Sequence, residues 1–426
     1  MAKPTASEKF LSVLNNFNIR EVDFKRPAVA ARAATAQTPV PLPAPLGPLT
    51  AFTGTWTGLG FNAIFRPNNA ATPTFPPPLS TSDNVLELNL TQETLLFSPN
   101  LGSIPNRGSG SQPDIFLNGV PYLQTINDVT SLPANGIHFE PGMWLSVPAT
   151  KDPNEVATIA RMASIPHGTT IVAQGTVIAT LAGPPKILSI GMTPFPPGQP
   201  AHPVVKFPSQ TATNNNTARL PQNLAPFIAA GTITQDVLDD PNFLLNEQIK
   251  HQKITETIVI GISTNPAAPL FFGPLPGGAS PTTPPPPITP SFGGGPANIA
   301  FLQGLAVPPP TGQGPNAQTI QMDAVFWIET VLYKVEVPEL EAGIPPVVLS
   351  PIATTPPTLQ PKFVASVPFL PGKKFAGDTI EVTATQIQYA QKVILNFAGL
   401  SWPHVSVATL VPSDPVPIPG SLLPMT

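Results

Sequence analysis

Cysteine is absent from this chain of 426 residues. Disulfide bonds, thiolate nucleophiles, iron–sulfur clusters and cysteine-based zinc sites are therefore excluded. The chain also lacks a GxSxG nucleophile elbow, an HExxH motif and a glycine-rich phosphate-binding loop. The common signatures of hydrolases and nucleotide-binding enzymes are thus missing.

Charged side chains are scarce as well. They make up 10% of the chain, against roughly 25% in ordinary soluble domains, and residues 257–322 contain no ionisable side chain at all. A weakly charged surface favours association, so we expect a homo-oligomer or larger assembly. The net charge of −4, with scattered lysine and arginine, argues against a nucleic-acid partner.

The sequence shows no targeting or membrane-spanning segment. Its first residues, MAKPTASEKF, lack the charged-then-apolar pattern of a secretory signal. No apolar run reaches the roughly 18–20 residues that a spanning helix needs. We therefore expect no membrane span and a cytoplasmic location, with unconventional export left open.

Proline and glycine are abundant instead, with 62 and 31 residues. Proline interrupts helices, so regular helix should not dominate. Valine, isoleucine, leucine and phenylalanine remain plentiful, which distinguishes the chain from a disordered proline-rich polymer. Short apolar runs between turn residues predict an all-β fold, an antiparallel barrel or a closely related sandwich.

Hydrophobic periodicity, helix-capping residues and turn residues locate the expected helices, loops and strands. Helices are predicted at 6–17 and at 241–252, where Asp240 is a plausible cap and Pro241 would open the helix. A loop is expected over 100–114, and a Pro/Gly loop over 273–296. Strands are predicted near 84–90, 93–98, 121–126, 136–147, 156–165, 169–181, 253–264, 297–304, 319–335, 376–397 and 404–411.

Three regions follow from this pattern. Residues 1–48 should form a short helix and an Ala/Pro arm, and residues 49–411 a single elaborated barrel domain with insertions at about 182–320. Residues 412–426 should form a Pro-rich tail suited, like the arm, to lying along a neighbouring molecule.

One histidine near the end of the chain is a candidate ligand. His404 belongs to LNFAGLSWPHVSVATL (395–410), and strand alternation groups it with Trp402, Ser406 and Ala408 on one face. If that face lines a barrel interior, the two small side chains leave space beside an imidazole. Such an imidazole can ligate a metal or a haem iron; the alternative is a surface or hydrogen-bonded core histidine.

Glycines surround a tryptophan at the other end, in LTAFTGTWTGLGFNAIFRP (49–67). Alternate glycines in a strand allow a bend, a bulge or close backbone approach. This GxWxGxG start resembles the first strand of calycins, and more narrowly that of the nitrobindin-like haem-binding barrels. FEPGMWLSVP (139–148), SIPHGTTIVAQG (164–175) and the His404–Ala408–Leu410 spacing are similar to further family segments, in the same order. The resemblance spans about residues 46–411 and extends to long bacterial proteins labelled haem-binding.

The resemblance implies an antiparallel calycin-like barrel that binds haem b, with His404 as the proximal ligand to the iron. Trp402, which is expected on the same face as His404, would pack against the porphyrin; the alternative is a core tryptophan. The resemblance also implies a distal wall that comprises Thr169, Thr170 and His167. His167 differs from the residue usual in the family, and the alternative is a turn histidine in PHG. Binding of NO, or weak action on peroxide or peroxynitrite, would follow.

Other polar residues carry weaker signals. His138 and Glu140 share a strand face, which fits a metal-site pair or a cross-strand hydrogen bond. Arg161 lies six residues before His167, but the spacing alone does not require them to converge. His202 and His251 lie in a loop and at a helix end.

Two other functions fit the same sequence. The first is a haem-free barrel that holds an apolar ligand such as a lipid or pigment. The second is a structural protein that self-assembles through its weakly charged surface, its arm and its tail.

Overall fold

The computed structural model describes residues 42, 44–71, 73–74, 82–152, 154–198, 204–270, 272, 295–298, 317–368 and 370–426. These belong to one compact unit, Leu42–Thr426. The helix expected at 6–17, the Ala/Pro arm up to residue 41, the loop at 273–294 and most of the strand expected at 297–304 lie outside the described residues.

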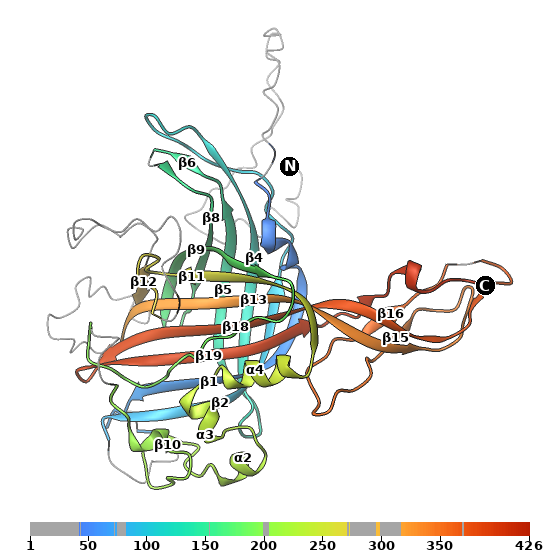
Figure 1. Cartoon of the computed structure of the whole chain (residues 1–426). Coiled ribbons are helices and arrows are strands. Elements are labelled where there is room, and N and C mark those ends of the chain that lie inside the picture. Colours follow the sequence, from blue (N-terminus) through green and yellow to red (C-terminus); the bar gives the residue numbers. More distant parts are fainter. Residues whose placement is uncertain are drawn as a thin grey trace, which may run out of the picture. The chain divides into compact units, whose positions relative to one another are not determined.

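Ten antiparallel strands close into a barrel, which confirms the predicted all-β calycin-like fold (Figure 1). Around the barrel the order is β2-β1-β19-β18-β13-β11-β9-β8-β5-β4, and β4 pairs back with β2. The strands are β1 (Gly54–Pro67), β2 (Asn84–Phe97), β4 (Ile115–Asp128), β5 (Asn135–Val147), β8 (Thr158–Ser164), β9 (Thr169–Leu181), β11 (Lys253–Ser263), β13 (Gln318–Val337), β18 (Asp378–Phe397) and β19 (Leu400–Pro412).

The first and last barrel strands meet at a seam that requires glycine. Gly58 and Gly60 of β1 pair with Leu410 and Ala408 of β19. A Cβ atom at Gly58 would lie 2.0 Å from the carbonyl oxygen of Thr409, and one at Gly60 would lie 2.3 Å from that of Val407. The alternating glycines thus allow the close backbone approach expected from the GxWxGxG pattern.

The barrel is filled at one end and hollow at the other. Each of the ten strands contributes buried apolar residues to a single cluster, which is therefore the interior. A 3-10 helix, η1 (Gly47–Ala51), closes the filled end with buried Leu49, and Phe52 follows it. The Phe52 ring stacks on Phe97 with centroids 4.8 Å apart and meets Trp144 edge-on at 5.3 Å. This plug leaves the opposite end of the barrel for a cavity.

The segment after β9 covers part of the outer barrel wall (Figure 1). It contains η2 (Pro208–Gln210), β10 (Arg219–Leu220), α2 (Ala225–Ala229), α3 (Gln235–Asp239) and α4 (Phe243–Lys250). Helix α4 confirms the helix predicted at 241–252, but its N-cap is Asn242 rather than the predicted Asp240. The Asp240 carboxylate accepts a hydrogen bond from the backbone N–H of Asn242. Arg219 is fully buried and donates only to backbone carbonyls of residues 209–222, which ties this segment together.

Strands β13 and β18 continue past their other barrel neighbours and build an extension (Figure 1). It contains β14 (Leu340–Glu341), β15 (Val347–Leu349), β16 (Phe363–Ala365), β17 (Lys374–Phe375), β20 (Val416–Pro417) and η3 (Gly420–Leu422). Strand β20 pairs with β16, and Ile418 and Leu423 are buried, so the tail at 412–426 packs on its own chain.

Four short strands complete the fold: β3 (Ile104–Asn106), β6 (Thr150–Lys151), β7 (Asn154–Glu155) and β12 (Gly295–Asn298). The two strands predicted at 84–90 and 93–98 are one continuous strand, because β2 pairs with β1 without interruption. Among the described residues, no helix combines the length and apolar character needed to cross a bilayer.

Candidate functional site

A cavity of about 460 Å³ occupies the hollow end of the barrel. This volume lies within the range of small-molecule sites. Apolar walls come from β1, β4, β18 and the turn after β8, with Ile64, Ile126, Val393, Leu395 and Ile165. Polar side chains also belong to the lining, so the cavity wall is partly polar and partly apolar.

His404 lines this cavity, as the sequence predicts. It pairs across the ladder with Val393, which also lines the cavity, while Ser406 pairs with Gln391. Ala408, next on the same face, is buried in the interior cluster. Ser406 therefore borders the cavity beside the imidazole, whereas Ala408 does not.

A hydrogen-bond network fixes the His404 ring. The Asn62 side-chain amide donates to His404 Nε2 at 2.6 Å and to Ser406 Oγ at 2.9 Å. The Asn62 carbonyl accepts from Asn89 Nδ2 at 3.2 Å. In this arrangement Nε2 is an acceptor, so the ring proton belongs on Nδ1.

Burial keeps the His404 ring uncharged. Desolvation lowers its pKa from 6.5 to about 3, and the charges of His138 and His167 act in the same direction. The site thus holds a neutral imidazole with an unprotonated nitrogen, the form that binds a metal.

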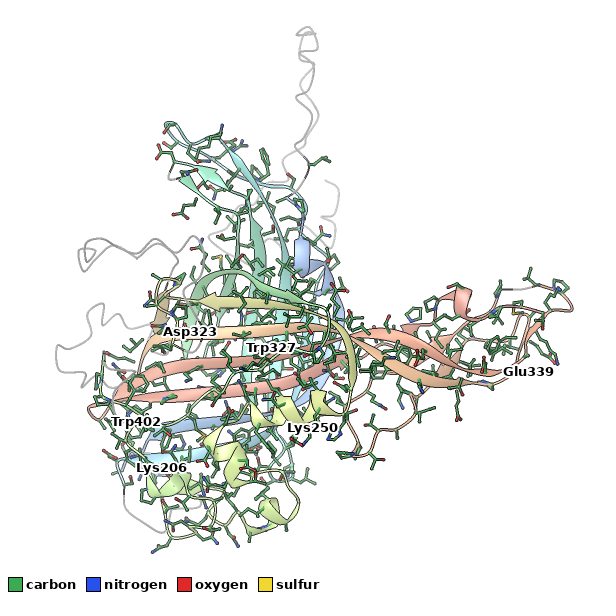
Figure 2. All side chains as sticks on the ribbon, viewed as in Figure 1. Lys206, Lys250, Asp323, Trp327, Glu339 and Trp402 are labelled. Atoms are coloured by element: carbon green, nitrogen blue, oxygen red, sulfur yellow. The ribbon has the colours of Figure 1, made fainter. Side chains whose placement is uncertain are left out.

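Trp402 does not join His404 in the cavity, which corrects the shared face predicted for them. Its ring stacks on Phe397, with centroids 4.7 Å apart and planes at 10°, and contacts Phe65 and Phe207 at 5.1 Å each. Figure 2 labels Trp402 near the hairpin end of β18 and β19. Pairing of β19 with β1 stops at Val405. Beyond that point Ser401 pairs with Phe195 of the segment after β9, and the indole of Trp402 packs on the outer cluster.

Two more histidines line the opposite wall. In the ring of ten strands, β5 lies four strands from β19 and β8 lies five, counted through β1. His138 belongs to β5, and His167 to the turn between β8 and β9. Their rings meet edge-to-face with centroids 5.2 Å apart. Three imidazoles from distant parts of the chain therefore share one cavity.

Of the two threonines predicted for this wall, only Thr169 reaches the cavity. Thr169 begins β9 and is buried in the lining. Thr170, next along the strand, points to the other side and is not part of the lining.

A buried ion pair supports the cavity floor: Arg161 belongs to the lining, whereas its partner Glu140 does not. Arg161 Nη2 donates to Glu140 Oε1 at 2.5 Å, and the Tyr122 hydroxyl donates to the same oxygen. Arg161 also donates to Tyr122 Oη at 2.8 Å and to Gln391 Oε1 at 2.7 Å. Burial alone would raise the pKa of Glu140, but the Arg161 charge and His138 bring it down to about 2.

His138 is attached to this floor. Its Nε2 donates to Glu140 Oε2 at 3.1 Å, so the pair on one strand face forms a direct hydrogen bond rather than a cross-strand one. Arg161, which spacing alone did not connect to the histidines, thus joins His138 through Glu140. The sequence does contain a signal for this position. Arg161 alternates with Ile159 and Ala163, which point into the barrel interior, so strand alternation directs the Arg161 side chain inward as well.

A second buried carboxyl group went unnoticed in the sequence. Glu93 accepts hydrogen bonds from the Tyr389 hydroxyl at 2.7 Å, from Gln124 Nε2 at 3.1 Å and from Thr91 Oγ1 at 3.1 Å. Burial raises its pKa, against the lowering effect of these donors. Glu93, Gln124 and Tyr389 all line the cavity, together with the sequence-unpredicted Asn62 and Asn89.

Within the part of the chain that the structure describes, no group of three or more histidine, aspartate or glutamate side chains is arranged to hold a metal ion. His404, the predicted metal ligand, thus stands without further protein ligands. Comparison of the chain with protein-family models, with curated proteins and with solved structures found no match.

Proposed function

We propose that the barrel binds haem b in its cavity, with His404 as the axial ligand to the iron. The observation that carries the proposal is a neutral imidazole, that of His404, in the lining of the cavity. A haem iron needs only one such protein nitrogen, so a cluster of ligands is not required. The iron would supply an open coordination position for a small molecule such as NO or a peroxide.

The residues present fit this group with one adjustment. Val393 and Leu395, beside His404, and Ile126 and Ile165 across the cavity supply apolar surface for a flat ring. His404 Nε2 is occupied by the Asn62 amide at 2.6 Å, so that hydrogen bond must break on ligation. Asn62 would keep its bonds to Ser406 and Asn89.

Haemin titration tests this proposal. The wild-type chain is expected to develop a Soret band at one equivalent, and His404→Ala to lose it. His251→Ala is the matched control, because His251 ends α4 and is not part of the cavity lining. Equal titration of all three proteins would refute His404 as the ligand.

Removal of the Asn62 amide should strengthen haem binding. Asn62→Ala frees Nε2 of a hydrogen bond that ligation otherwise breaks, and a net hydrogen bond contributes about 0.5–1.5 kcal/mol. We therefore expect haemin affinity to rise about two- to tenfold, measured by competitive transfer from a haem-binding reference protein. A loss of affinity would mean that Asn62 supports the bound state instead.

The alternative is a haem-free ligand. The polar floor of the cavity favours a ligand that is more polar than a lipid or a hydrocarbon pigment. Arg161, Glu93 and Tyr389 offer more polar groups than a lipid or a hydrocarbon pigment needs. A small molecule with both a ring and hydrogen-bonding groups suits the mixed lining. Mass spectrometry of the protein purified from its native host would reveal such a molecule, and its binding should be insensitive to His404→Ala.

A further inference from the structure

The wall opposite His404 contains a histidine with a fixed orientation. Glu140 is 0% exposed and anchored by Arg161 and Tyr122, so its carboxylate cannot move toward solvent. His138 donates Nε2–H to this anchored carboxylate. The other ring nitrogen, Nδ1, then holds the lone pair in the uncharged form and becomes a donor once the ring is protonated.

His167 extends this arrangement toward solvent. The two imidazole rings meet edge-to-face at 88° with centroids 5.2 Å apart, and His167 is exposed. Burial and the charge of His138 lower the pKa of His167, while Glu140 acts in the opposite direction.

We propose that His138 and His167 form a second, polar subsite that binds an anion or hydrogen-bond acceptor on the side of the cavity opposite His404. The inference rests on the proposed function, because it places this subsite across the bound haem from its axial ligand. Glu140 acts as the positioning residue: it touches His138 and orients that ring. Arg161 in turn keeps Glu140 ionised.

The chemistry of the subsite defines what it accepts. An imidazole backed by a carboxylate donates a charge-assisted hydrogen bond when protonated, and such bonds favour small anions over neutral molecules. The ligand class is therefore a small anion, or the anionic end of a larger molecule, bound at the open iron position.

Fluoride is a suitable probe, because its hold on a ferric haem depends on hydrogen-bond donors near the bound ion. Fluoride is titrated into the haemin-loaded full-length chain at pH 6 and followed by absorption. We expect His138→Gln and His167→Gln, each loaded with haemin through His404, to weaken fluoride binding about tenfold. His251→Gln should match the wild type.

Three outcomes are distinguishable. Weaker fluoride binding with haemin still bound through His404 supports the subsite and excludes general unfolding of the cavity. Equal fluoride affinity in all four proteins, each with haemin bound through His404, overturns the subsite and leaves the haem proposal intact. Absence of haemin binding in the wild type overturns both.

Discussion

Replacing Arg161 with methionine is expected to lower the free energy of unfolding by about 3–5 kcal/mol near neutral pH, because it leaves the Glu140 carboxylate buried without its cation. Arg161 is 3% exposed and Glu140 is 0% exposed, so water cannot take the place of the guanidinium. Methionine fills much of the same volume among Tyr122, Trp144 and Phe326, which surround the guanidinium at 5.6–5.7 Å. The measurement is urea denaturation followed by tryptophan fluorescence.

The pH dependence of this loss provides its signature. In the wild type the pKa of folded Glu140 is about 2, below the value of 4.5 in the unfolded chain. Glu140 therefore contributes stability above pH 4.5 that disappears as the pH falls toward 2. The destabilisation by Arg161→Met should shrink over that range, and the double variant with Glu140→Gln should recover much of it.

Arg107→Met is the matched control, since the Arg107 side chain is 75% exposed and its ion pair is at the surface. A loss below about 1 kcal/mol at Arg161 would contradict the view that the ion pair is a buried unit.

Replacing Glu329 with glutamine should stabilise the protein, by about 3–5 kcal/mol at pH 8 and above. Glu329 lies on the outer face of β13, fully buried, and burial raises its pKa to about 8. Gln386 donates to Glu329 Oε2 at 2.6 Å, but Oε1 has no partner among the described residues, and neither has the Tyr333 hydroxyl. The ionised carboxylate is thus poorly compensated.

The sign of the effect follows from the raised pKa. The folded protein retains the Glu329 proton up to about pH 8, whereas the unfolded chain releases it near 4.5. Wild-type stability therefore falls as the pH rises from 4.5 to 8, and glutamine removes that fall. The difference in free energy of unfolding between variant and wild type should be small at pH 4.5 and reach its full size at pH 8.

Glu336→Gln serves as the control, because Glu336 lies on the same strand but is exposed. A stabilisation by Glu329→Gln that is equal at both pH values would contradict the assigned ionisation.

The barrel could be predicted because strand signals are local. Alternation located β9 at 169–181, and β11 to within one residue. The glycines of β1 allowed a bend, a bulge or a close backbone approach, and the structure shows the close approach, to β19. Alternation placed His404 on one face with Ser406, but only the resemblance to known barrels implied that this face points inward. Trp402 does not obey this alternation, because β19 no longer pairs with β1 beyond Val405. The indole packs on aromatic side chains such as Phe397 instead.

The polar floor could not be predicted, because it depends on contacts between remote strands. Gln124 reaches Glu93 across 31 positions, and Tyr389 reaches it across 296. Each residue alone reads as an ordinary polar position in a strand. Only the closed order of the barrel brings them together and places two histidines across from His404.

Rescue of His404→Gly by free imidazole tests the central claim most directly. The glycine variant should bind haemin without the wild-type Soret band, and millimolar imidazole should restore that band by filling the space of the missing side chain. A glycine variant whose haemin spectrum already equals that of the wild type, and does not respond to imidazole, would contradict ligation by His404.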